Sequence, residues 1–211
     1  MKQTSTDSIE LPSSGQRGPA EHDRRLQILH VANEQFRQFG YRKTTVADLS
    51  KAIGITTAYI YRFFDSKQAI GEAIVAMVLG EMDTELRNLT AEQTTATRKM
   101  RAFTQQALLL SHALFMNESK LFELVVVAVE EQWCTAAGHQ SALGEMIRAI
   151  VEAGRSSGEF ERKTPLDDVA LAIQEALIPY THPPAMERRS LAELERGVTA
   201  VTDMILRSLA P

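Results

Sequence analysis

Apolar residues recur every three or four positions along most of the chain, which is the spacing of an amphipathic α-helix. About nine such segments are separated by glycines, prolines or helix-capping residues, and no segment alternates with the period of two that is typical of a strand. The pattern therefore predicts an all-α protein of about nine helices. The first runs from about Asp23 to Phe39, and the fourth runs from Ser66 or Lys67 to about Leu89.

The most informative stretch is residues 44–67, where two short helical patterns flank a glycine. Thr45 and Asp48 predict a cap for the first helix, because a hydroxyl and a carboxylate three residues apart can satisfy free N–H groups. Gly54 ends this helix, since glycine adopts the left-handed C-cap conformation at low cost. Thr56 then caps a second helix. This order predicts a helix-turn-helix whose second helix can enter the DNA major groove, although an ordinary helical hairpin has the same spacing.

The residues expected to face outward on the second helix favour DNA binding over a plain hairpin. Two tyrosines and a phenylalanine crowd one short exposed face, which is unfavourable in water and indicates a partner. The expected outward set is Thr57, Ala58, Tyr59, Tyr61, Arg62 and Phe63.

Five short motifs between about Leu26 and Gly71 follow one another in a specific order. They are Phe39-Gly40-Tyr41, Thr44-Thr45-Val46, Leu49-Ser50, Ala52-Ile53-Gly54-Ile55-Thr56 and Tyr61-Arg62-Phe63-Phe64-Asp65-Ser66-Lys67. Together they resemble the N-terminal DNA-binding domain of the TetR family of bacterial transcriptional regulators. The resemblance covers about a quarter of the chain, and the remainder is similar to the family only in length and helical layout.

The chain is expected to divide into three parts. Residues 1–21, rich in Ser, Thr, Gly and Pro, predict a disordered arm. Residues 22–68 would form a three-helix DNA-binding domain that contains the helix-turn-helix. Residues 69–211 would form a helical domain for effector binding and dimerisation, and the fourth helix, a rod of about 30 Å, would join the two domains.

The resemblance and the chemistry of the side chains imply a set of DNA contacts. The expected set is Thr45, Ala47, Thr56, Thr57, Ala58, Tyr59, Tyr61, Phe63 and Lys67. Residues 57–59 would lie near base edges. Contacts with phosphate are expected from Thr45, Thr56, Tyr61 and Lys67. Phe63 stands where many family members have histidine, and because phenylalanine cannot donate a hydrogen bond, we expect it to pack on sugar or thymine methyl groups.

The charge distribution agrees with this interpretation, although the net charge of the whole chain is −4. Residues 1–67 carry 10 basic and 7 acidic side chains, a net +3, whereas residues 68–211 carry 13 and 20, a net −7. A positive segment at the helix-turn-helix suits a phosphate backbone. The single cysteine, Cys134, excludes an internal disulfide. Without a signal core or a long apolar run, we expect a cytoplasmic protein with no membrane partner.

The last two predicted helices carry small and apolar residues on more than one face, which indicates two packing partners. Thr164 would cap the first of them, with Pro165 in its first turn, and Ser190 with Glu193 would form a capping box for the second. Burial within one chain could cover both faces, but we expect a homodimer through these helices. A symmetric dimer would present two recognition helices ~34 Å apart to a palindromic operator in double-stranded DNA.

The resemblance also implies a small-molecule effector bound among the fourth to eighth helices, and the apolar lining favours a lipophilic or aromatic one. The candidate ligand-binding residues are Phe103, Leu110, His112, Phe122, Glu130, Trp133 and Tyr180. Each could equally belong to an ordinary core. Several scattered polar residues could orient an effector or bind a metal. They are His139, His182 and Glu131, together with His112 and Glu130. They include no pair of ligands at i, i+4, so we expect no metal and no cofactor.

No catalytic motif accompanies these features. A nucleophile elbow, a Walker loop, a metalloprotease helix and a dinucleotide fingerprint are all missing from the sequence. We therefore expect a transcriptional regulator rather than an enzyme, and the resemblance implies a repressor that its effector releases from DNA. An architectural DNA-binding protein without effector control is the main alternative, and a helical enzyme is the remaining one.

Overall fold

The computed structural model describes residues 19–186 and 188–211. Within these residues it contains ten helical segments and no strand, which confirms the predicted all-α fold. The N-terminal end contains α1 (Pro19–Phe39), α2 (Val46–Ile53) and α3 (Thr57–Ile60), and α4 (Lys67–Ala91) follows. The body contains α5 (Ala96–Asn117), α6 (Ser119–Glu130), α7 (Cys134–Ser157), α8 (Leu166–Thr181), α9 (Pro183–Met186) and α10 (Leu191–Ser208). Most of the predicted disordered arm lies outside the described residues, and α1 begins earlier than expected.

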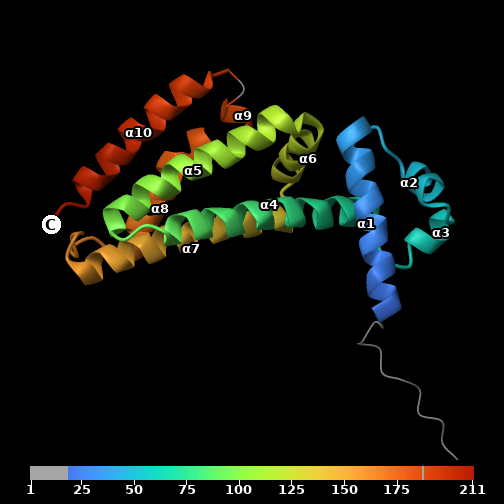
Figure 1. Ribbon diagram of the computed structural model, residues 1–211, viewed down its shortest axis with the longest axis horizontal. Helices are drawn as coiled ribbons and strands as arrows, with labels where there is room; N and C mark the ends of the chain where they lie inside the picture. Colours follow the sequence, from blue (N-terminus) through green and yellow to red (C-terminus); the bar gives the residue numbers. More distant parts are fainter. Residues whose placement is uncertain (1–18, 187) are drawn as a thin grey trace, which may run out of the picture.

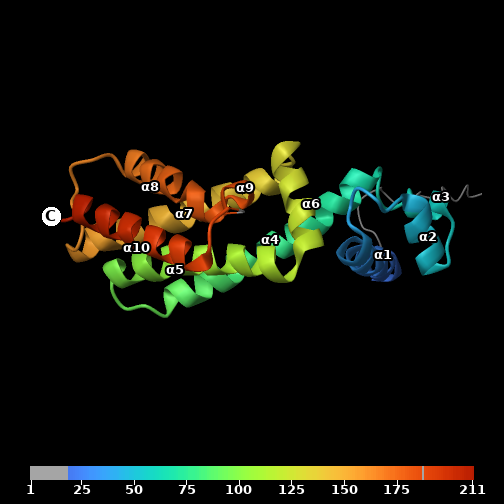
Figure 2. The same ribbon diagram turned by 90° about the horizontal axis from the view of Figure 1, so that it is seen from above.

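The helix α4 forms the axis of the molecule (Figure 1). Its N-terminal end meets α1, α2 packs against the far side of α1, and α3 packs against α2. Its C-terminal part lies among α5 and α7, with α8 and α10 beyond them. Seen from above, the three N-terminal helices stand at one end of an elongated body (Figure 2). With 25 residues, α4 is roughly 38 Å long and therefore reaches from the helix-turn-helix deep into the body.

Two hydrophobic cores hold the described part of the chain together. The N-terminal core contains Phe36 of α1, Leu49 of α2 and Ile74 of α4, and also Leu124 of α6. The C-terminal core joins α5, α7, α8 and α10 to the C-terminal part of α4, and it includes the buried ring of Phe103. Because α6 contributes to the N-terminal core, α1, α2 and α3 are packed directly onto the body.

Several helices begin and end at the capping residues that the sequence predicts. The N–H of Asp48 donates to the Thr45 hydroxyl at 3.1 Å, and the N–H of Thr45 donates to the Asp48 carboxylate at 2.9 Å. Gly54 takes the left-handed conformation, with φ of 76°, and ends α2. Ser190 and Glu193 form the second predicted capping box at the start of α10. All of these capping interactions involve only residues close in the chain.

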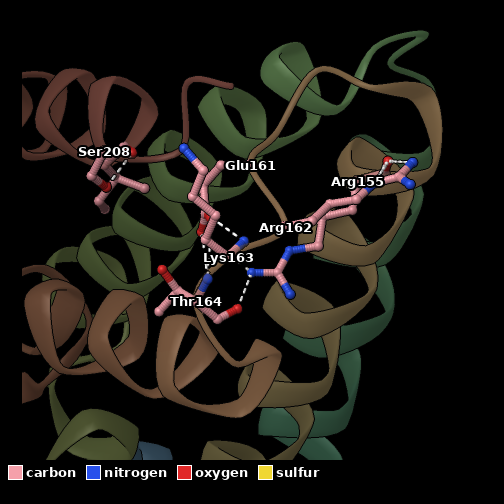
Figure 3. A network of polar contacts seen from close by, with 7 residues as sticks. Arg155, Glu161, Arg162, Lys163, Thr164 and Ser208 are labelled. Atoms are coloured by element: carbon pink, nitrogen blue, oxygen red, sulfur yellow. Dashed lines mark hydrogen bonds and ion pairs between the residues drawn. The ribbon is translucent and has the colours of Figure 1, made fainter.

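The start of α8 differs from the prediction. Pro165 is the N-cap residue and no side chain caps the helix, so the expected Thr164 cap is wrong. The connection before α8 is held instead by Glu161, whose carboxylate accepts hydrogen bonds from the N–H groups of Lys163 and Thr164 (Figure 3). Arg155 of α7 donates to the carbonyl of Thr164 at 2.6 Å. The backbone of Thr164 is thereby fixed by Glu161 of the connection and Arg155 of α7 and not by its own hydroxyl.

The start of α5 is capped from a distance. Glu159 accepts hydrogen bonds from the N–H groups of Ala96 and Thr97, both at 3.0 Å, while Thr95 caps the same turn locally. These backbone hydrogen bonds lower the pKa of the Glu159 carboxyl to about 2. The carboxylate therefore ties the connection after α7 to the first turn of α5.

Candidate nucleic-acid interface and effector cavity

The second helix of the predicted motif exists, but it is short. Its cap is Thr56, whose hydroxyl accepts a hydrogen bond from the N–H of Tyr59 at 3.2 Å. After Ile60 the chain continues in a hydrogen-bonded turn, in which the N–H of Phe63 donates to the carbonyl of Ile60 at 2.9 Å. Ile60 is completely buried and anchors α3 to the N-terminal core. The motif is therefore a helix-turn-helix whose second helix has only four residues.

Most of the predicted DNA contacts lie at the surface of this end of the molecule. The exposed members of the set are Thr45, Ala47, Thr56, Ala58 and Tyr61. The partly buried members are Thr57, Tyr59 and Lys67. The structure thus brings eight of the nine predicted residues to positions from which a side chain can reach a neighbouring molecule.

Phe63 is the exception, because its side chain is only 8% exposed. It belongs to the N-terminal core, and its ring makes an edge contact with the ring of Tyr59, with centroids 5.4 Å apart. The expectation that Phe63 faces outward and packs on DNA is wrong, because the turn after Ile60 directs its ring into the core. The exposed aromatic face is reduced to Tyr59 and Tyr61.

Internal contacts hold the partly buried side chains of the motif. The hydroxyls of Thr57 and Ser50 lie 3.2 Å apart, which joins α3 to α2. The guanidinium of Arg62 lies over the ring of Tyr59 at 5.3 Å, and it approaches the carboxylate of Glu21 at 4.0 Å. The outward reach of Tyr59 is therefore limited on one side by Phe63 and on the other by Arg62.

Lys67 lies at the junction between the motif and the body. Its ammonium is 4.2 Å from the centre of the Tyr41 ring, and burial lowers the pKa of the lysine. The ring of Tyr41 makes an edge contact with Trp133, the N-cap of α7, at 5.6 Å. A side chain at Gly71 would meet the Trp133 ring, since an added Cβ would lie 2.9 Å from it. The start of α4 is therefore closely packed between the motif and α7.

Ion pairs cross the same junction. Arg42 lies 3.5 Å from Glu130 of α6, and Arg37 of α1 pairs with Glu118. Glu130 was a candidate ligand residue, but it is exposed and faces Arg42 instead of a cavity. Its assignment to the effector site is wrong, because its exposed side chain faces Arg42 at the junction with the N-terminal helices.

A small cavity of about 30 Å³ lies inside the body. Its apolar lining comes from α4, α5, α6 and α7, and includes Leu79, Met82, Leu114, Phe122 and Val125. Its polar lining consists of Ser111, His139, Gln140, Thr181 and His182. A space of this size holds a water molecule or two, so an organic effector requires the walls to move.

A hollow of about 460 Å³ lies on the surface next to the cavity. The two spaces share five lining residues, namely Val129, Ala136, Gln140, Thr181 and His182. Trp133 and Ile178 line the hollow but not the cavity. Displacement of the shared side chains would join the two spaces into one pocket that opens beside the end of α8.

A buried polar contact joins α7 to α4 at the cavity wall. His139 Nδ1 lies 2.8 Å from Asp83 Oδ1, and the two side chains are 12% and 11% exposed. His139 was a candidate from the sequence, whereas Asp83 was not identified. The signal was the position of Asp83 on the apolar stripe of α4, four residues after Leu79 and three before Leu86, where a carboxylate requires a partner.

The structure does not bring the candidate ligand residues together. Phe122 lines the cavity and Trp133 lines the hollow. The candidates that pack in or against the C-terminal core instead are Phe103, Leu110 and Tyr180. His112 is half-buried, with its ring 6.4 Å from that of Phe115. Core packing explains most of these large side chains, because helical periodicity alone does not distinguish a cavity wall from a filled core.

Neither a metal cluster nor a membrane span is found in the part of the chain that the structure describes. No group of three or more His, Cys, Asp or Glu residues there is arranged to hold a metal ion. None of the described helices combines the length and apolar character needed to cross a membrane.

A helix-turn-helix at the end of a helical body is typical of a transcriptional regulator that carries its DNA-binding part and its regulatory part in the same chain. Two family models match the chain. The model described as "Bacterial regulatory proteins, tetR family" matches residues 28–74, and the model described as "Tetracyclin repressor-like, C-terminal domain" matches residues 96–202. The chain belongs to the TetR family of bacterial transcriptional regulators, as its motifs indicated. Proteins of this family bind DNA and small-molecule effectors and act as dimers.

Similar proteins support the same assignment. The HTH-type transcriptional repressor KstR2 of Rhodococcus jostii is 26% identical over 157 residues, which are 72% of this chain and 73% of that protein. A TetR-family regulator from Pectobacterium atrosepticum has the same fold, with a TM-score of 0.73 and 20% identity over 92% of this chain and 98% of its own. FadR of Bacillus subtilis, solved in complex with stearoyl-CoA, aligns with a TM-score of 0.63 and 17% identity over 87% and 98% of the two chains. The family and these relatives are regulators and not enzymes, as predicted.

Proposed function

We propose that this protein is a homodimeric repressor of a palindromic operator, released from DNA by a small lipophilic or aromatic effector. One observation carries the proposal. The mainly apolar cavity lies directly against α4, and α4 begins at the helix-turn-helix. A ligand that enlarges the cavity would therefore act on the helix that positions the recognition residues.

In this proposal, residues 57–59 contact base edges, and Tyr61 and Lys67 contact the phosphate backbone. Thr45 and Thr56 would bind phosphate beside the first turns of α2 and α3. The exposure of Thr45, Thr56, Ala58 and Tyr61 supports these roles. Lys67 would exchange its contact with the Tyr41 ring for a phosphate oxygen.

The dimer interface is proposed to consist of α8 and α10. Exposed large apolar side chains support it, since Leu171 and Ile178 lie two turns apart on α8 and Met204 lies on α10. A symmetric pairing of these helices would cover all three side chains and place two recognition helices on one face of DNA.

The proposed effector has a lipophilic or aromatic body and a hydrogen-bonding group. The apolar side chains of the cavity suit the body, while His139, Gln140 and His182 offer hydrogen bonds near the shared wall. The FadR structure, which has the same fold, contains stearoyl-CoA, a ligand with a long hydrocarbon chain. Because the effector would bind better to the enlarged cavity, it would shift the dimer toward a spacing that no longer fits the operator.

Footprinting on the DNA upstream of the gene tests this function. A discrete palindromic footprint that disappears with an effector supports the regulator. Uniform coverage with little sequence preference would instead establish the architectural alternative.

Candidate effectors are found by a thermal-shift screen, in which a ligand of the folded protein raises the melting temperature. The screen is followed by release from operator DNA, and the variant Leu114→Phe, which fills the cavity, should reduce the response to the effector.

A further inference from the structure

A second hollow is lined in part by the C-terminal end of α4. This end of α4 lies far from α1, α2 and α3 (Figure 1). The volume of the hollow is about 320 Å³, and its walls come from α4, α5 and α7. It shares no lining residue with the cavity or with the hollow beside Trp133. We call it the distal hollow. From Gly71 to Thr90, a residue of the distal hollow, α4 rises about 28 Å.

Thr90 is an unpaired polar group in the wall of the distal hollow. The residue is 7% exposed, and its hydroxyl has no hydrogen-bond partner among the described residues. A helical threonine usually donates to the carbonyl four residues earlier, as Thr84 of the same helix does to Gly80 at 2.8 Å. A buried hydroxyl without a partner is unfavourable, and because its oxygen is buried in this structure, rotation of the Thr90 side chain would bring it to a ligand in the hollow.

The charges around the distal hollow favour an anion. Arg87 of α4 and Lys99 of α5 line it, and neither forms an ion pair with another described residue. Glu145 of α7 is the acidic residue of the lining, so the formal charge of the site is +1. Two cations and a hydroxyl donor near one another are the groups that bind a carboxylate.

The rest of the lining is apolar. Met146 and Ile150 of α7 form it together with three alanines. Such a surface gains by covering hydrocarbon and offers nothing to a small inorganic anion. A ligand of this site therefore needs an anionic group and an apolar part.

We propose that the distal hollow binds a small anionic amphiphile, such as a monocarboxylate with a medium-length hydrocarbon chain. The carboxylate contacts Arg87, Lys99 and the hydroxyl of Thr90, and the hydrocarbon covers Met146 and Ile150. The hollow is open in this structure, so binding requires no enlargement, in contrast to the 30 Å³ cavity. The ligand bridges α4, α5 and α7 and thereby fixes the end of α4 opposite to the helix-turn-helix. This site goes beyond the proposed function and does not depend on it.

Calorimetric titration of the full-length protein with sodium octanoate tests the site, without DNA or an effector. Octan-1-ol is the matched neutral probe, because it has the same chain length and no charge. We expect saturable binding of octanoate and binding of the alcohol that is about tenfold weaker. The double variant Arg87→Gln, Lys99→Gln should weaken octanoate about tenfold and leave the alcohol unchanged. Thr90→Val, which keeps the shape and removes the hydroxyl, should also weaken octanoate.

Two filling variants separate the distal hollow from the effector cavity. Ala149→Leu places an isobutyl group in the distal hollow from an exposed position and should abolish octanoate binding. Leu114→Phe fills the cavity and should leave octanoate binding unchanged. The opposite pattern, or no saturable binding of octanoate to the wild type, would overturn the proposal. If Ala149→Leu does not fold, as judged by circular dichroism, the charge and hydroxyl variants decide the question.

Discussion

The two ends of this protein obtain their stability in different ways. In the DNA-binding end, the helix-turn-helix is built from short helices, with eight residues in α2 and four in α3, and isolated helices of such lengths are unstable in water. Capping hydrogen bonds and anchors such as Ile60 hold them in place. The body consists of helices of 12 to 25 residues around a large core, apart from the short α9. The motif therefore depends on the helices beneath it for its position, which suits a regulated contact surface.

Because the helix-turn-helix depends on the N-terminal core, we expect the largest loss of stability when a core ring is removed. Phe36→Ala removes a fully buried ring between α1 and the rest of the N-terminal core, and should lower the free energy of unfolding by about 4 kcal/mol. Phe39→Ala is the matched control, since Phe39 is on the same helix and half-exposed, and it should change stability by less than about 0.5 kcal/mol. Urea unfolding followed by circular dichroism measures both. Similar losses for the two variants would contradict the anchoring of the motif by Phe36.

The contact surface should respond in binding and not in stability. Tyr59→Ala should weaken specific operator binding by about 1–3 kcal/mol and leave the helical content unchanged. Lys67→Ala should weaken binding to all sequences alike and reduce the salt slope by about one. Titrations at several salt concentrations, with operator and unrelated DNA, distinguish the two residues. Unchanged operator affinity for Tyr59→Ala would remove it from the base-reading set, and an altered sequence preference for Lys67→Ala would exclude a purely phosphate role.

The junction between the two ends can be tested with two glycines of α4. Gly71→Ala brings a methyl group within 2.9 Å of the Trp133 ring and should destabilise the protein by about 1–2 kcal/mol. Gly80→Ala, where no neighbouring atom lies within 4 Å, should stabilise the helix by about 0.5–1 kcal/mol. Thermal unfolding gives the sign of each change. Equal stabilisation by the two substitutions would disprove close packing at Gly71. Operator titration of Gly71→Ala shows whether the junction also sets the position of the motif.

The smallest expected effect concerns the long-range cap of the body. Glu159→Ala should lower stability at neutral pH by about 1 kcal/mol, because two N–H groups of α5 lose their acceptor. The folded pKa of Glu159 is about 2, below its ordinary value of 4.5, so the carboxylate stabilises the fold fully above pH 4.5. That contribution is lost as the pH falls from 4.5 to about 2. Urea unfolding of both proteins across this range should show the curves converging, whereas a constant difference would mean that the charge of Glu159 is not involved.

The sequence by itself determined the features that need only near neighbours. The caps at Thr45, Thr56 and Ser190 and the glycine stop at Gly54 involve partners within four residues, so they could be identified before the structure was known. The all-α class and the family motifs followed from the same local order. The proposed division into domains at residue 68 is also a prediction from this level.

The tertiary structure alone decided which side chains meet across the fold. Phe63 is buried although its helical position suggested exposure, and Glu159 caps a helix more than sixty residues earlier. The pairing of Asp83 with His139, and the separation of Phe122 and Trp133 from the other candidate ligand residues, depend on how α4, α5 and α7 pack. Periodicity states that a side chain faces inward, but the shape of the opposing helices determines whether it meets a core, a carboxylate or an empty space.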